Sequence, residues 1–155
     1  DMMKNTLIKV FSLLLVLVFG LFLTACSKYS ALEKAFKNKG YSVNETLAEQ
    51  SKKIEEELKE NDKDMVVKLH LLTKDGSLSS ALIIEFNSTE DMVKAYEDSE
   101  TIKGFVKDVK NNEDAQKVYE ALQDSGYAKG NCLVIPLSIV PSTVSEIKEI
   151  VRSVK

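Results

Sequence analysis

Two alternating apolar segments, residues 65–73 and 78–86, constrain the fold more than any other part of the sequence. Alternation with a period of two is typical of strands that bury one face. The segments flank Lys74-Asp75-Gly76-Ser77, whose Asp-Gly pair supplies the positive φ angles that a two-residue hairpin turn demands. With Asp-Gly alone as the loop, Val67 lies opposite Ile84. The sequence therefore predicts an antiparallel hairpin at the centre of a sheet.

The two faces of this predicted hairpin differ in polarity. One face is almost wholly apolar and belongs to the core, with Val67, Leu69, Leu82 and Ile84 among its members. The other face mixes apolar and polar side chains, and we expect it to be half exposed, as an interaction surface or the floor of a shallow groove. Its members are Val66, Lys68, His70, Leu72, Ile83 and Glu85. The alternative is that the last helix, with Val144, Ile147 and Val151, covers this face.

Helix signals precede and follow the hairpin. Capping residues and apolar stripes predict helices that begin near Ser30, Asn44, Ser88, Asn112 and Pro141. Residues 132–135 predict one further strand. The fold class is therefore α+β, with a small antiparallel sheet (hairpin plus a third strand) packed with several helices, mainly on one face. By element order alone, a ferredoxin-like arrangement is the nearest named possibility, and it implies no function.

The beginning of the chain has a different character. Lys4 and Lys9 precede a run from Val10 to Phe22 that is apolar apart from Ser12 and Gly20, and small residues follow at Thr24 and Ala25. A basic start, an apolar middle and small residues before a cut are the three parts of a secretory signal. A membrane-spanning helix is the alternative, but it needs about 20 apolar residues, more than this run supplies.

The motif Leu23-Thr24-Ala25-Cys26 resembles the lipobox of bacterial lipoproteins, and the likeness covers residues 2–26. The resemblance implies a diacylglyceryl group on the Cys26 thiol, labelling by palmitate, and cleavage before Cys26. It divides the chain into a signal peptide (1–25), a lipidated cysteine with a short tether (26–29) and one α+β domain (30–155). It places the domain on the extracytoplasmic face of a bacterial cell membrane. Lysine-rich composition favours a low-GC Gram-positive host, while the Gram type stays open.

Charge limits the range of partners. Without residues 1–25 the chain keeps 19 basic and 23 acidic residues, a formal charge of −4. An acidic domain with scattered lysines predicts neither nucleic acid nor an anionic membrane surface as a partner. The predicted partners are the membrane, through the lipid, and a membrane or envelope protein.

The sequence predicts no catalytic or metal site. His70 is the only histidine, and no Gly-x-Ser-x-Gly nucleophile motif is present. Cys132 sits in an apolar strand, where cysteine usually behaves as a buried hydrophobe, although a pair with His70 on a neighbouring strand is not excluded. Apart from the covalent lipid we expect no cofactor, and we expect no enzyme.

Two functions fit these features. The first is a non-enzymatic protein-interaction module at the membrane surface. The second is a small-ligand-binding lipoprotein with a pocket between helices and sheet. A large apolar cavity would favour the second, and an exposed apolar patch the first.

Overall fold

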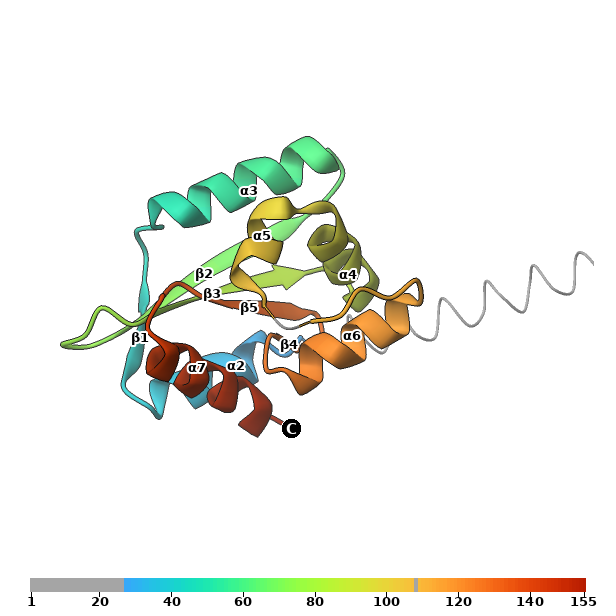
Figure 1. Cartoon of the computed structure of the whole chain (residues 1–155). Helices are drawn as coiled ribbons and strands as arrows, with labels where there is room; N and C mark the ends of the chain where they lie inside the picture. The colour runs from blue at the N-terminus through green and yellow to red at the C-terminus, as the bar shows by residue number, and fades with distance from the viewer. Residues whose placement is uncertain (1–26, 108) are drawn as a thin grey trace, which may run out of the picture.

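The computed structural model describes residues 27–107 and 109–155, so the motif that ends at Cys26 lies outside the described residues. Figure 1 shows a sheet between two groups of helices. The elements are α2 (Tyr29–Lys37), β1 (Tyr41–Asn44), α3 (Glu49–Asn61), β2 (Val67–Lys74), β3 (Ser80–Phe86), α4 (Thr89–Asp98), α5 (Glu100–Phe105), α6 (Ala115–Asp124), β4 (Ala128–Lys129), β5 (Cys132–Pro136) and α7 (Pro141–Ser153). Within these residues, none of the helices has both the length and the apolar character needed to cross a bilayer.

The strands form one antiparallel sheet in the order β1-β2-β3-β5-β4. The predicted α+β class and the predicted hairpin are confirmed, and β5 is the predicted third strand. The hairpin strand β3 is the central strand, as expected. The sheet also contains two strands that are too short for alternation to identify, because β1 has four residues and β4 has two.

The ferredoxin-like arrangement is not adopted. A ferredoxin-like fold is built on split βαβ units, in which a further strand lies between two parallel strands. Here the strands on either side of α3, β1 and β2, are direct antiparallel neighbours. The long connection through α4, α5 and α6 likewise returns to an antiparallel neighbour of β3.

The hairpin register differs from the prediction by two residues. Val67 pairs with Phe86, and Leu69 pairs with Ile84. The reason lies in the turn, where the Ser77 hydroxyl accepts a hydrogen bond from the Ser79 amide at 3.0 Å. The Lys74 amide donates to the Ser79 carbonyl at 3.0 Å, whereas an Asp-Gly loop would pair Lys74 with Ser77. The loop is therefore longer than Asp-Gly alone. Because side chains alternate with a period of two, a shift of two residues leaves each residue on its predicted face.

Four helices cover the predicted core face of the sheet. Ile54 and Leu58 of α3, Met92 of α4 and Leu122 of α6 are buried in one apolar cluster with side chains of β3 and β5. The predicted helix start at Ser88 is confirmed, because its hydroxyl accepts from the Asp91 amide at 3.1 Å. Burying both the helix stripes and the sheet face in one cluster supplies most of the stability of such a layer.

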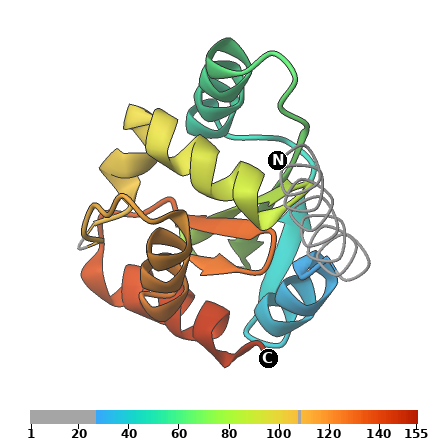
Figure 2. The ribbon, with the colours of Figure 1, turned by 90° about the vertical axis from the view of Figure 1, so that its right-hand side faces the viewer.

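The opposite face of the sheet is covered as well, so the expectation that this face is half exposed is wrong. α2 and α7 pack on it and bury Leu72 and Ile83 in a second apolar cluster. Figure 2 shows these two helices together below the sheet. The predicted interaction surface is therefore wrong at Leu72 and Ile83, which are fully buried. The alternative, that the last helix covers this face, is confirmed. α2 covers it together with α7, because the apolar side of α2 must also be buried.

Both apolar clusters draw their members from residues between Tyr29 and Val154. All five strands lie within the same limits. Among the described residues, both apolar clusters and every strand therefore lie within residues 29–154.

Candidate functional site

A group of polar and aromatic side chains gathers where the chain enters the domain. It joins the residues before and at the start of α2 to the Phe86 end of β3 and the Cys132 end of β5. We name it the entry cluster, and its members are Ser27, Lys28, Tyr29, His70, Glu85, Asn131 and Cys132.

Asn131 is the centre of the entry cluster. It follows Gly130, whose φ of +59° suits the two-residue turn between β4 and β5. The buried Asn131 amide accepts a hydrogen bond from the Lys28 backbone at 3.1 Å and donates one to the Phe86 carbonyl at 2.8 Å. One side chain therefore holds the entering backbone to the end of β3.

Glu85 makes the second connection to the entering chain. Its carboxylate accepts a hydrogen bond from the Ser27 hydroxyl at 2.6 Å, and its other oxygen lies 3.1 Å from His70 Nε2. Burial opposes ionisation, but hydrogen bonds from Ser27 and His70 outweigh it, so the pKa of Glu85 lies below its usual range. The carboxylate therefore stays ionised and ties β2, β3 and the entering chain together.

The Tyr29 ring closes the entry cluster on one side. It stacks on the His70 ring, with ring centroids 3.5 Å apart and an angle of 18° between the planes. Burial, with the nearby Glu33 carboxylate as the next cause, raises the pKa of Tyr29 above its usual range. The stacked rings bury apolar surface against each other, so this contact fixes α2 at its first residue.

The order of the groups does not suit nucleophilic catalysis. In a Ser-His-Asp arrangement the imidazole lies between hydroxyl and carboxylate. Here the Glu85 carboxylate lies between Ser27 and His70, so the imidazole cannot take the hydroxyl proton. Burial raises the pKa of the Cys132 thiol to about 12, which keeps it protonated and unreactive. The entry cluster is built to hold the chain.

The structure separates the six residues predicted as one surface. His70 and Glu85 belong to the entry cluster, and Leu72 and Ile83 lie in the core under α2 and α7. Val66 and Lys68 are exposed. Lys68 lies directly opposite Glu85 in the ladder, yet the Glu85 carboxylate pairs with His70 instead.

Four members of the entry cluster were not predicted as site residues: Ser27, Lys28, Tyr29 and Asn131. Gly130-Asn131 between two short extended segments is a hairpin signal and points to a turn. No local pattern connects Asn131 with Ser27, because the two residues are 104 positions apart. Only the assembled sheet brings the two segments together.

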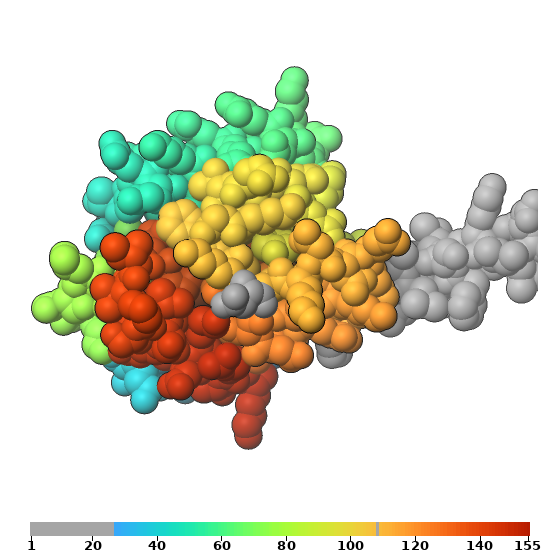
Figure 3. Space-filling model, in the orientation of Figure 1, coloured from blue at the N-terminus to red at the C-terminus, as the bar shows by residue number. Residues whose placement is uncertain are grey.

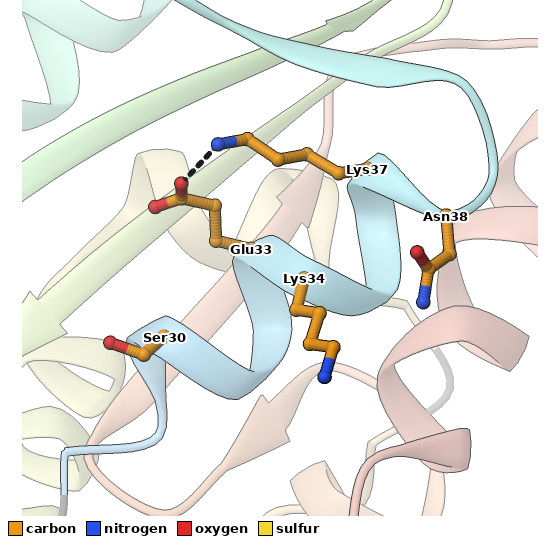
Figure 4. A pocket seen from close by; sticks show the side chains of 5 residues that line it. All are labelled: Ser30, Glu33, Lys34, Lys37 and Asn38. Carbon is orange, nitrogen blue, oxygen red and sulfur yellow. Dashed lines mark hydrogen bonds and ion pairs between the residues drawn. The ribbon is translucent and has the colours of Figure 1, made fainter.

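The surface hollows described here are open and polar. One, of about 380 Å³, is lined by Ser30, Glu33, Lys34, Lys37 and Asn38 alone. Figure 4 shows that these side chains come from α2 and its end, with Lys34 and Asn38 pointing away from the Glu33–Lys37 pair. A second hollow, of about 430 Å³, lies near Tyr96 and the segment after α5, with polar residues in the majority. Neither resembles an enclosed apolar pocket between helices and sheet.

Among the residues that the structure describes, no group of three or more His, Cys, Asp or Glu side chains could hold a metal ion. The geometry of the site is thus that of a clamp on the entering chain.

No protein-family model matches this chain, and neither the curated proteins nor the solved structures include a significant match.

Proposed function

We propose that this chain is a lipid-anchored lipoprotein of the extracytoplasmic face of a bacterial cell membrane, with a diacylglyceryl group on Cys26. Its folded domain acts as a non-enzymatic protein-interaction module. One observation carries the proposal: the entry cluster clamps Ser27 and Lys28 to the sheet immediately after Cys26. Each residue spans at most about 3.8 Å, so a lipid on Cys26 holds this end of the domain at the bilayer.

The clamp supports the anchoring role because the short tether expected from the sequence, residues 26–29, is held to the sheet from Ser27 onward. Tyr29 is the first residue of α2, and Ser27 and Lys28 are already hydrogen-bonded to Asn131 and Glu85. A domain without a stalk meets only partners that are themselves in or on the membrane. We therefore propose a membrane or envelope protein as the partner.

The two most exposed large apolar side chains of the described residues lie at the other end of the sheet. Leu78 in the β2–β3 loop is 99% exposed, and Ile139 in the β5–α7 loop is 98% exposed. The two loops are neighbours, because the Leu137 amide donates to the Ser80 carbonyl at 2.9 Å and the Ser79 and Thr143 hydroxyls lie 3.5 Å apart. Figure 3 shows the β2–β3 loop projecting from the body of the molecule. Fully exposed large apolar side chains on two neighbouring loops are the feature of this end that would suit a protein partner.

The lipid proposal predicts that Cys26→Ala abolishes metabolic labelling by palmitate and leaves the precursor uncut in the host. The reason is that the proposed acceptor thiol is lost. The matched control is Cys132→Ala, which removes the other thiol but should keep full labelling, since that thiol is buried and protonated. Labelling of the Cys26→Ala protein, or a mature amino terminus other than Cys26 in mass spectrometry, would reject the proposal.

The partner proposal predicts that the double variant Leu78→Ser/Ile139→Ser loses its envelope partner while the fold is kept. Both side chains are exposed, so the melting temperature should change by no more than about 2 °C. The measurement is photo-crosslinking in native membranes from a probe at position 140, followed by identification of the product. The conservative control Leu78→Met/Ile139→Leu should keep the crosslink. Equal crosslinking of the serine variant would exclude these loops.

A further inference from the structure

The charged residues are sorted between the two helical layers. The layer of α2 and α7, counted over residues 27–40 and 137–155, has seven basic and three acidic residues, a net charge of +4. The opposite layer, counted over residues 45–66 and 87–126 without Asp108, has nine basic and 17 acidic residues, a net charge of −8. Although the net charge of the whole chain is negative, the layer of α2 and α7 is therefore basic, and we call its surface the basic face. Its basic residues are Lys28, Lys34, Lys37, Lys39, Lys148, Arg152 and Lys155.

Most of these cations are not neutralised within the protein. Glu33 pairs with Lys37, and Glu146 pairs with Lys74 of β2, so two of the three carboxylates in the layer are already occupied. Lys34, Lys39 and Arg152 are exposed, and none of them forms an ion pair with a carboxylate of the described residues. The basic face thus presents free positive charge to its surroundings.

The position of this face relative to the entering chain is the second observation. α2 begins at Tyr29, directly after the clamped residues Ser27 and Lys28. Figures 1 and 2, taken from directions 90° apart, both show α2 and α7 together on one side of the molecule and α3 on the other. A lipid on Cys26 would therefore attach beside the basic layer.

We propose that the outer face of α2 and α7 lies on an anionic phospholipid bilayer. The inference rests on the proposed lipid anchor for its location, and on charge for its orientation. Lysine and arginine side chains within a Debye length of about 10 Å are attracted by anionic headgroups. The same headgroups repel the acidic layer of α3 to α6, so both layers favour one orientation. The prediction from composition, that an anionic membrane surface is excluded, assumed an even distribution of charge that the fold does not have.

Vesicle co-sedimentation of residues 27–155, which contain every helix and strand that the structure describes, tests this face without the lipid. The vesicles contain either phosphatidylcholine alone or phosphatidylcholine with roughly one third phosphatidylglycerol, in about 50 mM salt. We expect the wild-type domain to bind the anionic vesicles at least ~10-fold more tightly than the neutral ones, with the difference lost in about 0.5 M salt.

Two charge-reversal variants separate the basic face from net charge. Lys34→Glu/Lys39→Glu/Arg152→Glu should weaken binding to anionic vesicles at least ~10-fold. The matched control, Lys52→Glu/Lys53→Glu/Lys63→Glu, changes the net charge equally on exposed residues of the α3 layer and should leave binding within about twofold of wild type. Circular dichroism melts verify that both variants fold.

Three outcomes would overturn the inference: no preference of the wild type for anionic vesicles, equal weakening by both variants, or stronger weakening by the control. Because residues 27–155 lack Cys26, these outcomes do not depend on lipidation. Failure of palmitate labelling would reject the proposed anchor and leave the vesicle result standing, so the two proposals fail separately.

Discussion

Ile83→Ala should lower the free energy of unfolding by about 2–5 kcal/mol. Ile83 is fully buried between the sheet and the layer of α2 and α7, where it pairs with Val134 of β5. Removing three buried carbons loses their transfer free energy and leaves a cavity that close-packed neighbours fill only in part. A urea melt of residues 27–155, followed by circular dichroism, measures the loss.

Val66→Ala is the matched control for Ile83→Ala. Val66 precedes β2 and is 54% exposed, so its truncation should cost no more than about 0.5 kcal/mol. If Ile83→Ala were equally mild, α2 and α7 could not cover this face, and the second apolar cluster would be wrong. Val66 and Ile83 lie on the same face, so a large loss at Val66 with little at Ile83 would instead mean that the covered part of this face lies at its Val66 end and not under α2 and α7.

The hairpin was predictable because its signals are local. Alternation over residues 65–73 and 78–86 assigns each side chain to a face, and the face survives the error in register. The loop length was not predictable from Asp75-Gly76, because the hydrogen bond from the Ser79 amide to the Ser77 hydroxyl adds two residues to the turn. Such bonds compete with the ladder and leave no periodic trace in the sequence.

The covering of the second face was not predictable from one strand pattern. Lys68, His70 and Glu85 give this face the polarity of a half-exposed surface. In the fold Lys68 and Glu85 form the pair nearest the Phe86 end of β3. The next pair joins His70 to the buried Ile83, and Leu72 lies one pair farther along, under α2 and α7. One face of the hairpin therefore changes from a polar to a buried environment along its length. The alternation of side chains tells which face a residue lies on, but not where along the strand that face becomes buried.

The entry cluster shows a similar limit. His70 and Glu85 were among the predicted site residues because a polar pair on a sheet face needs partners. The partners themselves, Ser27 and Asn131, come from the two ends of the domain and meet only after β5 has joined β3. Without that pairing, neither residue has a local signal beyond the Gly130-Asn131 turn.

Gly126→Ala should destabilise the domain by more than about 3 kcal/mol. Gly126 follows the end of α6 with a φ of +83°, a left-handed conformation that costs an L-residue about 1–2 kcal/mol. In addition, a Cβ at this position would lie 2.6 Å from the Lys148 carbonyl oxygen, and the backbone of α7 cannot yield as a flexible side chain can. The loss should appear in the same urea melt, with the slope of the transition unchanged.

Gly76→Ala distinguishes the steric clash expected at Gly126 from the cost of the left-handed backbone conformation. Gly76 has a similar φ of +73°, but no atom lies within 4 Å of its added Cβ. Its substitution should therefore cost only the strain of about 1–2 kcal/mol, and the excess at Gly126 measures how closely the end of α6 packs on α7. Equal losses at the two glycines would mean that α7 moves away from Gly126 without cost. In that case the covering of the second face, on which the burial of Ile83 and the orientation of the basic face both depend, would be looser than the structure describes.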